Sequence, residues 1–165
     1  MAKAKGPVPD GYYSITPQLT LDNAAKSIDW YKKAFNAKEL SRFDGPDGKV
    51  MHAELQIGNS RFMVNDVLMG KGPKAHGGSP ASLWIYTPDV DALYKQAIAA
   101  GAKPAEGPMS GVQDQFWGDR TGMVTDPEGY RWTIATHKED YTPDELKKRG
   151  EEFMKQMAQQ HQPAH

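Results

Sequence analysis

The chain contains an internal repeat, and this repeat limits the folds that the chain can adopt. Residues 36–38 (NAK) recur as residues 101–103 (GAK), and residues 60–64 (SRFMV) align with residues 130–134 (YRWTI), about 65 to 70 residues later. Repeats of this kind are copies of one supersecondary unit, and their apolar faces pack together. We therefore expect two similar modules in one folded body.

Each copy has the residue pattern of a strand, a helix and three further strands. In the first copy we expect a strand over residues 14–21, with Pro17 at an edge or a bulge, and then a helix capped by Asp22 or Asn23. This helix carries apolar residues at helical spacing and ends near Asn36. The remaining strands and turns are expected at residues 38–43, 45–48, 49–57, 58–59 and 60–65.

The second copy repeats this order. Residues 82–86 have the pattern of a strand, and Asp89 is placed to cap a helix that stops at Gly101. A turn at residues 128–129 precedes the closing strand. The chain divides accordingly into a first module (12–66), a linker (67–80), a second module (81–138) and a C-terminal amphipathic helix (141–160).

The predicted C-terminal helix has a strong start signal. Thr142 is a capping residue, Pro143 occupies the first turn, and Glu145 stands at the capping-box position. An apolar stripe follows, which we expect to pack on the body or on a partner subunit. Its members are Leu146, Phe153, Met154 and Met157.

Composition excludes several function classes. The 165 residues have a formal net charge of -1 with both signs interspersed, which disfavours nucleic-acid and membrane partners. The sequence has no cysteine, which removes thiol chemistry and fits a reducing cytoplasm. Because no apolar run is long enough for a secretion signal or a membrane span, we expect a cytoplasmic protein.

One motif connects this repeat to a known family. Residues 126–130 (DPEGY) precede the last predicted strand, and residues 27–31 (SIDWY) lie in the first helix. In this order they resemble the vicinal oxygen chelate superfamily of glyoxalases, bleomycin resistance proteins and dioxygenases, over about residues 14–137. The resemblance implies an α+β fold in which two βαβββ modules form curved mixed sheets around a cavity. Segments similar to the PhnB-like branch are residues 51–55, 114–120 and 132–137.

The resemblance also identifies four positions for metal ligands. Metalloenzymes of the superfamily draw their ligands from the first and last strands of each module, and these positions correspond here to Thr16, Met63, Ser82 and Thr133. None of the four supplies a carboxylate or an imidazole for a hard or borderline cation. We therefore predict no metal and no other cofactor at this place.

Strand alternation predicts which side chains face the helices and which face the cavity, because residues two apart share a face. The predicted core set is Leu19, Leu21, Ala53, Leu55, Ile57, Phe62, Val64, Leu83, Ile85, Trp132 and Ile134. The opposite set mixes aromatic and hydrogen-bonding groups and suits either a ligand cavity or a solvated face. Its members are Thr16, Gln18, His52, Glu54, Gln56, Arg61, Met63, Ser82, Trp84, Tyr86, Arg131 and Thr133.

Two features of the sequence, one in this opposite set and one in a later segment, have both a functional and a structural interpretation. His52 and Glu54 share a strand face, so they either act in proton transfer or metal binding, or bond each other or Arg61. In residues 114–120, Trp117 and Arg120 either cover a cavity mouth and meet an anion, or form a structural corner.

Together with these residues, the resemblance implies a homodimeric protein that binds a small aromatic or polar molecule without a metal. The alternative is a metal-dependent lyase, isomerase or dioxygenase with a displaced divalent site near the candidate catalytic pair His52 and Glu54. The predicted ligand-binding residues are Gln18, His52, Glu54, Gln56, Met63, Trp84, Tyr86, Trp117, Arg120 and Thr133.

Overall fold

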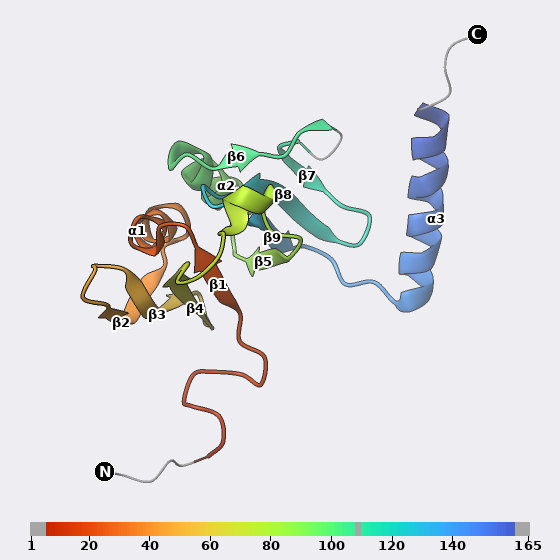
Figure 1. Ribbon diagram of the computed structural model, residues 1–165. Coiled ribbons are helices and arrows are strands. Elements are labelled where there is room, and N and C mark those ends of the chain that lie inside the picture. Colours follow the sequence, from red (N-terminus) through yellow and green to blue (C-terminus); the bar gives the residue numbers. More distant parts are fainter. Residues whose placement is uncertain (1–5, 108–109, 161–165) are drawn as a thin grey trace.

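The computed structural model describes residues 6–107 and 110–160, with only the backbone at Met157 and Gln160. Its first part is a four-stranded sheet in the order β1-β4-β3-β2, with helix α1 (Ala24–Phe35) on one side (Figure 1). β1 and β4 run parallel, and the other neighbours are antiparallel. The strands are β1 (Gln18–Leu21), β2 (Lys38–Asp44), β3 (Val50–Ile57) and β4 (Ser60–Asp66).

The second part repeats this topology. Its five-stranded sheet has the order β5-β9-β8-β6, with β5 and β9 parallel and β7 paired to β8. A short 3-10 helix, η1 (Pro73–His76), lies in the connection between the two sheets. The α+β fold with two βαβββ modules is thus confirmed. The elements are β5 (Ser82–Tyr86), α2 (Val90–Ala99), β6 (Lys103–Pro104), β7 (Val112–Asp114), β8 (Asp119–Thr125) and β9 (Arg131–His137).

Local side-chain chemistry sets the helix ends, as predicted. The Asn23 side chain accepts a hydrogen bond from Lys26 N at the start of α1, and the Asp89 side chain accepts one from Ala92 N at the start of α2. α1 ends at Asn36, whose φ of 56° is the left-handed conformation that asparagine tolerates better than most residues.

The predicted first strand is wrong in its first half. β1 covers Gln18–Leu21, and residues 14–17 are not part of it. The Thr16 hydroxyl instead donates to Tyr13 O at 3.1 Å. Pro17 has no N–H to donate, and the parallel pairing begins at its carbonyl, which accepts from Met63 N at 2.9 Å.

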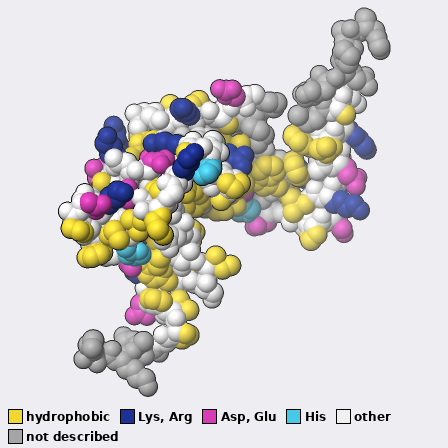
Figure 2. All heavy atoms as spheres, viewed as in Figure 1, with side chains coloured by type: hydrophobic (Ala, Val, Ile, Leu, Met, Phe, Trp, Pro, Cys, Tyr) yellow, Lys and Arg dark blue, Asp and Glu magenta, His cyan; other side chains and the backbone are white. Residues whose placement is uncertain are grey.

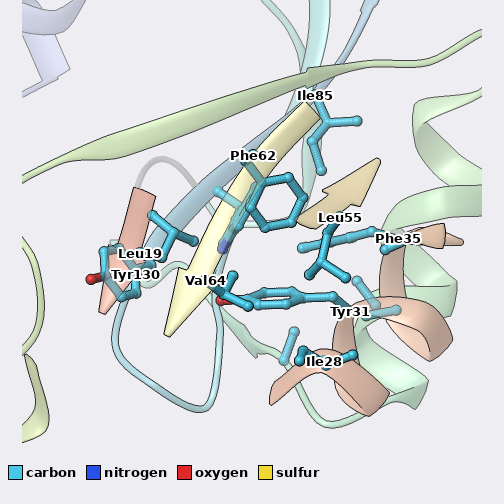
Figure 3. Close-up of a cluster of buried hydrophobic side chains, with 14 of the residues drawn as sticks. Leu19, Ile28, Tyr31, Phe35, Leu55, Phe62, Val64, Ile85 and Tyr130 are labelled. Atoms are coloured by element: carbon cyan, nitrogen blue, oxygen red, sulfur yellow. The ribbon is translucent and has the colours of Figure 1, made fainter. Parts of the chain in front are cut away.

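One core joins both modules. Tyr31 and Phe35 of α1 pack against Trp132 of β9 with ring centroids 5.6 and 5.0 Å apart, and Phe62 of β4 completes the cluster (Figure 3). The helices also contact each other, since Trp30 Nε1 donates to Ala100 O at 2.8 Å. Burial of aromatic surface from both sheets makes the modules one folded unit.

The predicted core set faces this interior. Nine of its members are buried, and the other two, Ile57 and Leu83, are half-buried and pack against the same core. Alternation therefore assigned the two sides of β1, β3, β4, β5 and β9 correctly. It leaves the opposite set, apart from Thr16, which lies before β1, on the side away from the helices.

Helix α3 (Pro143–Gln160) projects from the body in Figure 1. Its start has the predicted capping box, in which Thr142 N donates to Glu145 Oε2 at 2.8 Å. Near the foot of the helix, Arg149 Nε donates to Phe116 O at 2.7 Å, and the Phe116 and Phe153 rings lie 5.3 Å apart. Figure 2 shows hydrophobic side chains at this junction.

The apolar stripe of α3 is only partly covered. Leu146 and Phe153 are half-buried and Met154 is exposed, while the Met157 side chain lies outside the described part of the structure. Within residues 6–107 and 110–160, no helix has the length and apolar character needed to cross a membrane.

Candidate functional site

Five of the predicted ligand-binding residues share the side of the first sheet that faces away from α1. The strand register places Glu54 beside Met63, and Gln18 on the other side of Met63. His52 and Gln56 flank Glu54 on the same face of β3. We call this surface the first open face.

Two side chains of the first open face are held by hydrogen bonds, and two others face each other at a longer distance. Gln18 Nε2 donates to Asn65 Oδ1 at 2.8 Å, and Gln56 Nε2 donates to Gly58 O at 2.9 Å. His52 Nε2 lies 3.7 Å from Glu54 Oε1, and their side chains are 40% and 28% exposed. This spacing suits an ion pair when the imidazole is protonated.

The corresponding side of the second sheet carries aromatic residues, and we call it the second open face. Trp84 and Tyr86 project from β5 with ring centroids 6.1 Å apart, and they are 46% and 62% exposed. Large exposed aromatic rings side by side are typical of binding surfaces.

Asp119 connects the second open face to the loop before β8. Its Oδ2 accepts from the Tyr86 hydroxyl at 3.1 Å and from Trp117 Nε1 at 3.1 Å. The structure thus brings the predicted residues Tyr86 and Trp117 together around one buried carboxylate, with Trp84 beside Tyr86. Burial and the bond to Asp119 raise the pKa of Tyr86, which keeps its hydroxyl protonated as a donor.

His137 extends this cluster to the segment before α3. Its Nδ1 lies 2.7 Å from Asp119 Oδ1, and its Nε2 lies 3.0 Å from Asp140 Oδ1. These hydrogen bonds, to Asp119 first and then to Asp140, raise the pKa of His137. Both ring nitrogens therefore have acceptors for the imidazolium form.

A cleft of about 430 Å³ lies where the two sheets approach each other. Its walls come from the segment before β1, the β3–β4 hairpin and β5, and its lining includes Tyr13, Ile15, Arg61, Leu83, Trp84 and Tyr86. A neighbouring cleft of about 230 Å³ contains Thr133 and Met123 and shares Trp84. Trp84 thus separates two clefts that are each large enough for a ring-sized group.

Arg120 lies apart from the other candidates. Its guanidinium faces α2, where Nε and Nη2 donate to the two carboxylate oxygens of Asp91 at 2.8 and 2.9 Å, and Nη1 donates to Asp114 at 3.2 Å. The contact with Asp114 agrees with the structural alternative, in which Arg120 pairs with Asp114 and Asp119, whereas the bidentate partner Asp91 was not predicted. Because these donors have partners on the helix side, we leave Arg120 out of the proposed site.

Thr16, Met63, Ser82 and Thr133, the four positions that the resemblance identifies for metal ligands, carry hydroxyl groups and one thioether. Thr16 donates its hydroxyl to Tyr13 O, and Thr133 is buried. Met63 offers only a thioether, which suits soft ions. Among the residues that the structure describes, no group of three or more His, Cys, Asp or Glu side chains is arranged to hold a metal ion.

The predicted ligand-binding residues did not include Arg61 and Tyr12. Arg61 lies beside Gln56 on the first open face, and the Tyr12 ring lies 5.2 Å from its guanidinium carbon. Strand alternation had predicted that Arg61 lies on this face, so the position of Arg61, but not its contact with Tyr12, could be read from the sequence. Tyr12 follows a segment rich in Pro and Gly that had no pattern to connect it to a sheet.

Comparison with known proteins agrees with this fold. A Mycobacterium bovis protein of unassigned function is 40% identical over 139 residues, which cover 81% of this chain and 89% of that protein. A solved Arabidopsis thaliana gene product is 28% identical, with a TM-score of 0.60 over 75% of this chain and 98% of its own. A PhnB protein from Bacillus cereus shares the fold at 16% identity, with a TM-score of 0.56 over 75% of this chain and 99% of its own.

The sequence itself also matches a family description. The family model matches residues 15–134, which include the first sheet, the second sheet up to the middle of β9, both packed helices and the 126–130 motif. The chain belongs to the Glyoxalase/Bleomycin resistance protein/Dioxygenase superfamily.

Proposed function

We propose that this protein binds a small aromatic molecule on its open faces without a resident metal. The observation that carries the proposal is the exposed pair Trp84 and Tyr86 at the edge of the 430 Å³ cleft. Aromatic walls with a few hydrogen-bonding groups select planar ligands. The superfamily includes bleomycin resistance proteins as well as enzymes, so its fold is compatible with a function other than catalysis.

The proposed active form is a homodimer in the cytoplasm. Each sheet packs its helix on one side and leaves the other side open, so a second copy can cover the open faces and enclose a ligand. Sedimentation velocity is expected to give about twice the 18.3 kDa chain mass. A monomer at all concentrations would remove the dimer from the proposal.

Calorimetric titration with planar aromatic compounds tests the binding function. We expect wild-type protein to bind at least one class of compound, and Trp84→Ala to weaken binding by about tenfold or more through the loss of ring contact. Trp30→Phe is the matched control, because Trp30 lies between the two helices. Equal binding by wild type and Trp84→Ala would move the ligand away from the second open face.

The competing function is a metal-dependent enzyme that uses His52 and Glu54. The 3.7 Å approach of these two side chains on an accessible face is the observation in its favour. Metal analysis of untagged protein, purified without chelators, separates the two functions. Near-stoichiometric Ni, Zn, Mn or Fe that is lost in His52→Ala or Glu54→Ala would overturn the metal-free proposal.

A further inference from the structure

The segment before β1 crosses the first open face. Arg61 Nη1 donates to Asp10 O at 2.7 Å, and the Arg61 guanidinium lies over the Tyr12 ring at 5.2 Å. Between them, Gly11 has a φ of 82°, and a Cβ at this position would collide with the guanidinium. Figure 1 shows the segment on the side of the sheet opposite α1. Residues 10–12 are therefore fitted to Arg61.

Tyr12 fits this face incompletely. Its ring stacks on Arg61, and its buried hydroxyl lies beside the Glu54 carboxylate without the geometry of a full hydrogen bond. Burial and the nearby Glu54 carboxylate raise the pKa of Tyr12, so the hydroxyl remains a neutral donor. A buried donor without a full hydrogen bond costs free energy, which makes this contact easier to displace than a satisfied one.

The surroundings of Tyr12 define what would fit better. Arg61 offers a cation to the face of a ring, and Glu54 offers carboxylate oxygens near the ring's polar end. A ring that carries a donor at hydrogen-bonding distance from Glu54 would satisfy both groups. An anionic oxygen at that end would be repelled by the carboxylate.

We propose that the ligand site extends from the 430 Å³ cleft across Arg61, which lines it, onto the part of the first open face that Tyr12 covers, and that Tyr12 is a displaceable internal occupant there. The ligand is then a planar aromatic molecule with a neutral hydrogen-bond donor, such as a phenol or an aromatic amine. This inference rests on the proposed binding function and gives it a ligand class. The ligand ring replaces the Tyr12 ring on Arg61, and the ligand's donor bonds Glu54. The ligand and residues 10–12 therefore compete for the same face, and ligand binding displaces residues 10–12.

The test uses the full chain and 4-nitrophenol as the probe, because its neutral and anionic forms differ in colour at neutral pH. Tyr12→Ala is expected to bind the probe about tenfold more tightly than wild type, which is the scale of one lost ring–cation contact. Tyr12→Phe keeps the competing ring without the hydroxyl, so it should bind the probe no better than wild type. Bound probe should lose its phenolate colour, and 4-nitroanisole, which has no donor, should bind more weakly.

The outcomes separate this inference from the proposed function. Unchanged affinity in Tyr12→Ala, with binding still lost in Trp84→Ala, would overturn the role of Tyr12 and leave the binding function standing. Tighter binding of 4-nitroanisole than of 4-nitrophenol would overturn the ligand class. If neither wild type nor Tyr12→Ala binds the probe, both the ligand class and the role of Tyr12 at this site are wrong.

A second measurement reads the segment without any ligand. Hydrogen exchange of residues 10–13 is expected to rise severalfold in Arg61→Ala, because the guanidinium holds Asp10 and Tyr12. The matched control is Arg131→Ala, the repeat-equivalent arginine, which contacts Pro80 O instead. Equal exchange in wild type and Arg61→Ala would show that the segment is not docked, and it would overturn the inference whatever the probe binds.

Discussion

Each side of these sheets has a carboxylate close to tyrosine side chains, but the two carboxylates differ in how many hydrogen bonds they accept. On the helix side, the Asp126 carboxylate accepts hydrogen bonds from Tyr31, Trp132 and the backbone N–H groups of Glu128 and Tyr130, at 2.7 to 3.0 Å. On the open side, the neighbours of Glu54 among the described residues are His52 at 3.7 Å and the Tyr12 hydroxyl, which lacks the geometry of a full hydrogen bond. A saturated carboxylate stabilises the fold, whereas an unsaturated one is available to a ligand.

The family motif at residues 126–130 belongs to the saturated side. Glu128 of this motif accepts from Ser27 at 3.2 Å, from Lys74 at 3.1 Å and from Asp22 N at 2.8 Å, so it ties the second sheet to the first module. The motif that identifies the family thus connects the two modules through hydrogen bonds. It carries no information about the ligand, which explains why the fold is easier to assign than the function.

The largest expected effect comes from breaking the saturated side. Asp126→Ala leaves buried Tyr31 and Trp132 donors without an acceptor and should lower the free energy of unfolding by about 3–4 kcal/mol. Urea unfolding followed by tryptophan fluorescence measures this loss. Asp126→Asn keeps one acceptor oxygen and should lose less. An alanine variant within about 1 kcal/mol of wild type would contradict the assigned role.

A smaller loss follows from removing one donor. Tyr31→Phe keeps the ring packing and removes the hydroxyl that donates to Asp126, so we expect a loss of about 1–2 kcal/mol in the same urea experiment. Tyr86→Phe is the matched control on the open side, because its hydroxyl is partly exposed and also reaches an aspartate. A greater loss for the control than for Tyr31→Phe would reverse the comparison.

A still smaller stability effect is expected at the centre of the open side. Trp84→Ala removes a half-exposed ring and should change the free energy of unfolding by no more than about 0.5 kcal/mol, although it weakens ligand binding. Measuring both quantities on one preparation separates the two roles. A loss of stability as large as that of Asp126→Ala would place Trp84 in the core instead.

The smallest effect is the pH dependence of His137. Since Asp119 and Asp140 raise its pKa in the folded protein, its contribution is full below the usual histidine value of about 6.5 and is lost as the pH rises through the raised value. Stability should therefore fall slightly from about pH 6 to pH 8, and His137→Asn should remove this slope. His76→Asn, at an exposed linker histidine, should keep it.

Much of the fold could be predicted because it depends on local patterns. Helix caps at Asn23 and Asp89 and strand alternation in β3 act over a few residues, so the sequence displays them directly. The site was harder, because the partners that decide it are remote in sequence. Asp91 of α2 pairs with Arg120, and Arg61 of β4 packs on the Tyr12 ring.

A nuclear magnetic resonance titration of labelled protein with 4-nitrophenol tests the comparison between the two sides most directly. Backbone amides of residues 52–63 and 82–86 are expected to shift together with residues 10–13, while those of 126–130 stay in place. Shifts confined to the helix side, or no shift at saturating probe, would contradict the assignment of the open faces to ligand binding.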